Sequence, residues 1–277
     1  MAGKIFRHIP FGTAFLLLFL FGGQSICIST VTSNNSWPKE FYYYNPDSPQ
    51  SNLGHLKQEF DAFLSENNFS YAFQPFTHFA DFHRLNSKNH PSFILVPDWY
   101  YRQYGKTLGL RPLLVPLRHG NNSYKKILLI SPVSSEAVND YDIISFAMTT
   151  MGPDVPISVI KGLLADQLIS IQQLNIINVP KDLDAILALV LGQVKMALVA
   201  QDNLQTIADA NPRIVQRIKK LNKTVTVPMP VICYEENQVD KEDVERFISV
   251  FMKMAKEHPR NKIMEMLQID DWQKFTQ

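Results

Sequence analysis

The sequence has 277 residues, with 27 Lys and Arg against 26 Asp and Glu, and a formal net charge of +1 at pH 7. A balanced charge gives no basic footprint for nucleic acid, so we expect no nucleic-acid partner. Two cysteines are too few for a disulfide framework, and the length suits one large domain or two lobes that each bury a core.

The N-terminus has the three parts of a secretory signal peptide. A positive segment at residues 4–8 precedes an apolar run at 11–21, and the small residues that follow permit cleavage after Ser25 or Ser29. The apolar run is shorter than the roughly 20 residues that a membrane-spanning helix needs. We therefore expect residues 1–29 to be removed on export.

Short apolar strands alternate with amphipathic helices along the rest of the chain. The predicted strands lie at about 40–44, 70–75, 92–96, 126–131, 143–148, 175–179, 196–200 and 225–233. The predicted helices lie at about 51–65, 76–85, 153–168, 181–191, 202–220 and 241–256. This alternation predicts the α/β class, with mixed sheets flanked by helices.

Two segments indicate that the chain passes between two lobes. The first is at residues 115–124, where an apolar strand ends in a polar turn. The return is at 224–234, whose Pro228 and Pro230 cannot donate ladder hydrogen bonds and so suit a hinge. The prediction is a two-strand hinge joining lobe 1, from residues 30–118 and 229–277, to lobe 2, from residues 119–228.

Four stretches of the chain carry a resemblance to a known family, and they are residues 43–47 with 53–64, 95–100 with 110–113, 143–152, and 185–203. In order and spacing they resemble the phosphonate/phosphate-type substrate-binding proteins of ABC transporters. The resemblance implies a two-lobed periplasmic-binding-protein type 2 fold and a periplasmic location. It also implies the capture of a small polar or anionic ligand in a cleft between the lobes.

The family's anion-binding loop corresponds to Thr149, Thr150, Met151 and Gly152 in this sequence. In the family, a strand ends there in a hydroxyl-rich glycine loop before a helix. Two hydroxyl groups and the free N–H groups of a helix N-terminus favour a small anion. An ordinary helix cap accounts for the same residue types.

The sequence departs from the family pattern at this site. Met151 stands where a third hydroxyl is usual, and Lys181 with Asp182 replaces a histidine before the next helix. The acidic positions after the following strand are shifted, to Gln201 and Asp202. The four polar residues Lys181, Asp182, Gln201 and Asp202 remain candidates for binding the ligand.

Lobe 1 contributes candidates on the loops that follow two strands, and they are Tyr44, Asn45, Asp47, Asp98, Trp99 and Tyr100. Open α/β sheets bind ligands at the carboxyl ends of their strands. The alternative is that Trp99 and Tyr100 begin a helix and pack locally. The aspartates make the predicted cleft partly acidic, which leaves room for an amine-bearing or zwitterionic ligand.

Catalytic and metal-binding patterns are missing from the sequence. His78 and His83 are five residues apart, so they do not share a helix face, and no Cys or carboxylate lies at ligand spacing around them. Neither a nucleophile elbow nor a glycine-rich phosphate-binding motif occurs. We therefore expect no enzyme, no metal site and no cofactor.

Two functions remain open for such a chain. The first is a receptor that delivers a small molecule to an ABC permease. The second is a sensory or partner-binding protein on the same fold that works with a membrane sensor protein. We expect a monomer in both cases.

Overall fold

The computed structural model describes residues 39–50, 52–131, 143–153, 155–165, 174–257 and 261–276. All of these belong to one compact unit, Trp37–Gln277. The predicted signal peptide lies outside the described residues, as do positions 166–168 of one predicted helix. Within the described ranges, no helix combines the length and apolar character needed to cross a membrane.

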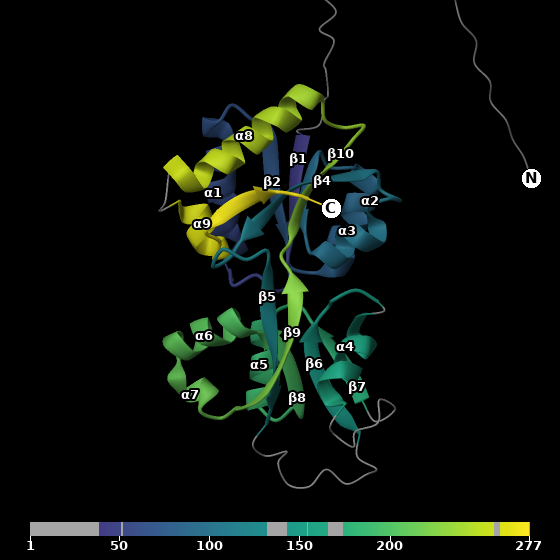
Figure 1. Ribbon diagram of the computed structural model, residues 1–277, viewed down its shortest axis with the longest axis vertical. Helices are drawn as coiled ribbons and strands as arrows, with labels where there is room; N and C mark the ends of the chain where they lie inside the picture. Colours follow the sequence, from purple (N-terminus) through teal and green to yellow (C-terminus); the bar gives the residue numbers. More distant parts are fainter. Residues whose placement is uncertain are drawn as a thin grey trace, which may run out of the picture. The chain divides into compact units, whose positions relative to one another are not determined.

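The first sheet has six strands in the order β11-β4-β10-β3-β1-β2 (Figure 1). Its strands are β1 (Lys39–Tyr44), β2 (Tyr71–Phe76), β3 (Phe93–Val96), β4 (Leu110–Leu117), β10 (Val231–Glu235) and β11 (Asp271–Lys274). β1 is parallel to β2 and β3, whereas β10 is antiparallel to β3 and β4. The carboxyl ends of β1, β2 and β3 therefore lie at the same edge of the sheet.

Helices cover both faces of this sheet because β1 is apolar on both sides. The helices on one face are α1 (Leu53–Glu66), α8 (Lys241–Glu257) and α9 (Lys262–Leu267), and those on the other are α2 (Phe79–Asn89) and α3 (Asp98–Tyr104) (Figure 1). Phe41 and Tyr43 pack in the core with α1 and α8. Tyr42 and Tyr44 pack in the core with α2 and α3. Alternate residues of a strand point to opposite faces, which explains this division.

The second sheet has five strands in the order β7-β6-β8-β5-β9. Its strands are β5 (Ser123–Ile130), β6 (Ile144–Thr149), β7 (Leu174–Val179), β8 (Met196–Ala200) and β9 (Lys219–Pro228). β6 is parallel to β7 and β8, and β5 is antiparallel to β8 and β9. This sheet is therefore mixed as well.

The second sheet is also covered on both faces. Its helices are α4 (Val155–Leu164) on one face and α5 (Asp182–Val190), α6 (Gln201–Ala210) and α7 (Pro212–Val215) on the other. Ile127 and Leu129 pack in the core with α5 and α6, while Leu128 packs in the core with α4. The predicted α/β class with mixed sheets flanked by helices is confirmed.

Two short segments connect the sheets. An isolated bridge between Arg118 and Asn121 follows β4, and the chain returns through Met229 and Pro230 between β9 and β10. The N–H of Met229 donates to the carbonyl of Asn122 at 2.9 Å, so the two segments lie side by side. The strands of the first sheet come from residues 39–117 and 231–274, and those of the second from 123–228.

Two predicted elements are wrong in extent. The single strand predicted at 225–233 is two strands in different sheets, β9 and β10, separated at Met229 and Pro230. The helix predicted at 202–220 ends at Ala210, because Pro212 cannot donate a helical hydrogen bond and disfavours helix at the residue before it. The rest of that range holds the short helix α7 and the first two residues of strand β9, Lys219 and Lys220.

Other elements differ from the prediction in position. α2 begins at Phe79 rather than 76, because Phe76 ends β2. Of the short elements, α9 and β11 were not predicted, and α3 was given only as the alternative to a loop. They have between four and seven residues each, too few to show a clear hydrophobic period.

Candidate functional site

A turn after β1 carries the acidic residue at the centre of the candidate site. The side-chain oxygen of Asn45 accepts a hydrogen bond from the N–H of Asp47 at 3.1 Å, and the Asn45 carbonyl accepts from the N–H of Ser48 at 3.2 Å. Asparagine favours turns through such bonds to the following backbone. The turn holds Asp47 in a position where its side chain is only 7% exposed.

Three side chains of the second sheet bind the Asp47 carboxylate. Lys126 donates to Oδ1 at 2.7 Å, Thr149 donates to the same oxygen at 2.5 Å, and the hydroxyl of Tyr124 donates to Oδ2. Lys126 also donates to the Thr149 hydroxyl at 2.5 Å. Because Asp47 follows β1 and its donors lie on β5 and β6, these bonds join the two sheets.

A second buried carboxylate, Asp182 at the start of α5, lies beside this group. Its Oδ2 accepts from the N–H of Ala200 at 2.9 Å and from the side-chain amide of Asn203 at 2.8 Å. The same amide donates to the carbonyl of Asp47 at 3.0 Å, and Lys126 Nζ is 3.5 Å from Asp182 Oδ1. We call Asp47, Tyr124, Lys126, Thr149, Asp182 and Asn203 the inter-sheet cluster.

Charges in the inter-sheet cluster depend on one another. Burial disfavours the charged form of Lys126, yet Asp182 and Asp47 together raise the pKa of its ammonium group. Burial would raise the pKa of Asp47, but the charge of Lys126 and the bonds from Lys126, Thr149 and Tyr124 lower it. Lys126 therefore stays protonated and Asp47 ionised at neutral pH, as a bonded pair removed from water.

Asp182 has a less complete set of partners. Burial raises the pKa of this carboxyl to about 6. The charge of Lys126 acts to lower this pKa, and the nearby charge of Asp47 acts to raise it. Oδ1 of Asp182 and Oδ1 of Asn203 are buried without a hydrogen-bond partner among the described residues. Because both bonds of the Asn203 amide nitrogen go to acceptors, its orientation is fixed and its oxygen faces the other way.

The predicted anion-binding loop contributes one member to the cluster. Thr149, the last residue of β6, is fully buried within it. Thr150 is half-buried, and Met151 is buried in the core of the second sheet. Gly152 has a φ of +97°, and a Cβ there would lie 3.2 Å from the Trp99 ring. The structure therefore brings Trp99, from α3 of the first sheet, against this loop.

Other predicted residues also make contacts between the two sheets. The ammonium group of Lys181 donates to the carbonyl of Gln50 at 3.2 Å. Asp202 pairs with Arg118 at 3.1 Å, next to the segment that leaves β4. Gln201 is exposed at the start of α6 and makes no contact with the cluster that the structure describes.

The structure places Asp98 and Tyr100 within the first sheet's own packing, whereas Trp99 packs there and also reaches Gly152. Asp98, Trp99 and Tyr100 belong to α3, so the predicted loop is wrong and the alternative of a helix start is right. Asp98 pairs with Arg102 of the same helix. The Tyr100 hydroxyl accepts from Asn86 at 3.0 Å.

Tyr44 is also turned away from the inter-sheet cluster. Its ring is stacked on Phe82 of α2, with the ring centroids 5.3 Å apart. Burial raises the pKa of the Tyr44 hydroxyl, so that group stays protonated. It is therefore part of the first sheet's aromatic core.

Three members of the cluster were not predicted from the sequence: Tyr124, Lys126 and Asn203. Lys126 could have been found from the sequence, because it shares one face of an apolar strand with Leu128 and Ile130. That strand is covered on both sides. A charged residue at such a position requires a buried partner. Asn203 follows the predicted Asp202 directly.

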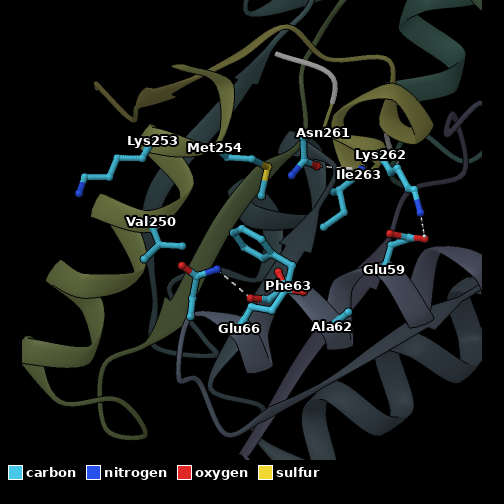
Figure 2. A pocket seen from close by; sticks show the side chains of 11 residues that line it. Glu59, Ala62, Phe63, Glu66, Val250, Lys253, Met254, Asn261, Lys262 and Ile263 are labelled. Carbon is cyan, nitrogen blue, oxygen red and sulfur yellow. Dashed lines mark hydrogen bonds and ion pairs between the residues drawn. The ribbon is translucent and has the colours of Figure 1, made fainter. Parts of the chain in front are cut away.

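Cavities elsewhere in the molecule hold few of the predicted residues. Figure 2 shows a cavity of about 420 Å³ among α1, α8 and α9, where Lys262 pairs with Glu59 at 3.1 Å. None of the predicted site residues lines it. A cavity of about 410 Å³ near the two connecting segments is lined in part by Asp98, Asn122 and Met229. Over the described ranges, no group of three or more metal-ligating side chains is found.

Known proteins match this architecture closely in fold. The model of a family described as the periplasmic substrate-binding protein of the phosphonate ABC transporter matches residues 42–277. A binding protein component of an ABC phosphonate transporter from Pseudomonas aeruginosa has a TM-score of 0.67 at 12% identity, over 86% of this chain and 81% of that one. No curated protein sequence matches the chain.

Two further structures with the same fold belong to proteins with different roles. PhnD1 from Prochlorococcus marinus, in complex with methylphosphonate, has a TM-score of 0.65 at 10% identity, over 86% of this chain and 92% of that one. A histidine kinase sensor domain with similarity to periplasmic binding proteins has a TM-score of 0.54 at 13% identity, over 85% of this chain and 98% of that one. The family match confirms the predicted resemblance. The solved structures, at 10–13% identity, show the fold alone.

Proposed function

Because the chain belongs to the family of periplasmic substrate-binding proteins of phosphonate ABC transporters, we propose that it is an exported receptor that holds a small polar or anionic solute between its two sheets. It delivers that solute to an ABC permease and catalyses no reaction. Residues 1–29 direct its export and are removed. The receptor acts as a monomer.

One observation carries this proposal: polar groups from both sheets converge at the carboxyl ends of their strands. Asp47 follows β1, Thr149 ends β6, and Asp182 begins the helix after β7. Open α/β sheets bind their ligands at this end of the strands. Trp99 lies against Gly152 beside the cluster and provides an apolar wall.

Solute capture in this proposal uses the two connecting segments as a hinge. Residues 30–118 and 229–277 form one lobe, and residues 119–228 form the other. The paired segments at 118–122 and 229–230 absorb the change in backbone angles when the lobes close. Their short length supports a hinge, because a few residues absorb the change in backbone angles when such folds close.

A signalling role is the second candidate, and the similarity to a histidine kinase sensor domain favours it. Both roles require a solute, so binding alone does not separate them. A permease and an ATPase encoded beside this chain support transport, whereas a signalling protein encoded there supports sensing.

Calorimetric titration of the purified protein with methylphosphonate, inorganic phosphate and L-arginine tests the proposal. We expect saturable binding of at least one probe. Trp99→Ala should weaken that binding about 10-fold or more, because it removes the apolar wall beside Gly152. Lys262→Ala, in the cavity of Figure 2, is the matched control and should bind as the wild type does. If Lys262→Ala loses binding and Trp99→Ala keeps it, the solute binds in the cavity of Figure 2 and not between the sheets. If no probe binds the wild type, the result counts against a receptor of this class.

A further inference from the structure

Three hydrogen-bond donors converge on one carboxylate in the inter-sheet cluster. Lys126 Nζ and the Thr149 hydroxyl lie 2.7 and 2.5 Å from Asp47 Oδ1, and the Tyr124 hydroxyl donates to Oδ2. One ammonium group and two hydroxyl groups aimed at a pair of oxygens form an oxyanion site, since charge-assisted bonds to carboxylate and phosphate are the strong ones. The site is already filled by an anion of the chain itself.

The donors and the anion belong to different parts of the fold. Tyr124 and Lys126 lie on β5 and Thr149 on β6, so the donors are held by two strands of the second sheet, with β8 between them. Asp47 reaches them from the loop after β1 of the first sheet. The donor set therefore does not depend on the backbone that supplies the carboxylate.

Lys126 cannot be left without an anion at this position. Its side chain is fully buried, and Asp182 is at 3.5 Å against 2.7 Å for Asp47. Removing the Asp47 carboxylate leaves the buried Lys126 with Asp182, at 3.5 Å, as its remaining ion-pair partner, and takes the acceptor from two hydroxyl groups. Losing the nearer partner of a buried charge is unfavourable, so the vacated space favours an external oxyanion.

We propose that Asp47 is an internal ligand of an oxyanion site made by Tyr124, Lys126 and Thr149. An external carboxylate, phosphate or phosphonate binds there only in competition with Asp47. This inference rests on the proposed function, because it concerns the same site. Asp47 is then the residue that limits the protein's affinity for small anions.

Chemical rescue of Asp47→Ala tests the proposal. The melting temperature of the purified variant is measured in sodium acetate, sodium phosphate and methylphosphonate, against sodium chloride at equal ionic strength to remove general screening. We expect each oxyanion to raise the melting temperature of Asp47→Ala by about 3 °C or more. A ligand at a concentration of roughly ten times its Kd gives a shift of this size. The wild type should shift by less than about 1 °C under the same conditions.

Asp243→Ala is the matched control, because Asp243 also binds a tyrosine and a lysine but lies near the surface of the first sheet. Its melting temperature should respond to the oxyanions no more than that of the wild type. An Asp47→Ala response equal to that of Asp243→Ala overturns the proposal.

Asp47→Asn covers the case in which Asp47→Ala does not fold, because the amide keeps the shape of the side chain and removes its charge. Titration with methylphosphonate should show at least about 10-fold tighter binding than to the wild type, and equal affinity overturns the proposal. If the wild type binds no probe while oxyanions stabilise Asp47→Ala, the proposed function fails and this inference stands. If methylphosphonate binds the wild type as tightly as it binds Asp47→Ala, the proposed function stands and this inference fails.

Discussion

Asp47 and Asp243 accept hydrogen bonds from the same kinds of side chain in two different environments. Asp243 receives the Tyr71 hydroxyl at 3.0 Å and Lys39 at 3.2 Å, on the first sheet's side of the molecule. The Lys39 side chain is 46% exposed, whereas Lys126, the partner of Asp47, is 0% exposed. The chemistry of the two clusters is matched, and their burial is not.

The contrast shows how burial changes what an ion pair does. Exposed pairs contribute about 0–1 kcal/mol to stability because water and salt screen them. A buried pair gains more attraction but loses the hydration of both ions, so its net contribution is small while the loss of one partner is costly. The inter-sheet cluster is therefore sensitive to single substitutions, and the cluster around Asp243 is not.

Lys126→Met should have the largest effect. It leaves Asp47 and Asp182 buried together without a cation, and we expect the free energy of unfolding to fall by about 3–5 kcal/mol. Urea denaturation followed by circular dichroism measures this. The matched substitution Lys39→Met should cost less than about 1 kcal/mol. Equal losses for the two variants would contradict the comparison.

The pH dependence of stability should separate the two clusters next. The pKa of Asp182 is raised to about 6 in the folded protein, against about 3.9 in an unfolded chain. Between these values the folded protein binds more protons, so the free energy of unfolding falls as pH rises, by on the order of 3 kcal/mol. The pKa of Asp47 is lowered, so its contribution is lost only below about pH 4.

Asp182→Asn tests this sign, because the amide keeps the shape and does not titrate. The difference in unfolding free energy between wild type and variant should change by on the order of 3 kcal/mol from pH 4 to pH 7, with the wild type losing stability. Asp209→Asn, on the exposed face of α6, should follow the wild type at every pH. A wild type that gains stability relative to Asp182→Asn over this range would show that the carboxyl is ionised more readily than its burial implies.

The sheets could be predicted from local patterns, since apolar runs such as Phe93–Val96 fix where buried strands lie. Helix α3 could not, because Trp99 and Tyr100 suit both a ligand wall and a packed helix. A signal was nevertheless present, because Asp98 is an acidic residue where a helix would begin, and negative charge is favourable in a helix's first turn.

The candidate site was predicted one residue at a time, but the contacts among its members were not. Asp47, Thr149 and Asp182 were named, yet Asp47 and Lys126 are 79 residues apart and meet only because the two sheets contact each other. Hydrophobic periods describe one element and carry no information on which loops of separate sheets meet. Lys126 was overlooked because it begins the predicted strand, where a polar residue is ordinary.

Asp243→Ala should have the smallest effect and is the sharpest check on the exposed cluster. The Asp243 side chain is 19% exposed, and the side chains of its charged partners Lys39 and Arg246 are 46% and 45% exposed. We expect the free energy of unfolding to fall by less than about 1 kcal/mol, and by less still in 1 M NaCl, where exposed charges more than about 3 Å apart are screened. Urea denaturation at low and high salt measures both values. A loss above about 2 kcal/mol that salt does not reduce would mean that this carboxylate is as strongly coupled as Asp47, and that burial does not explain the difference between the two clusters.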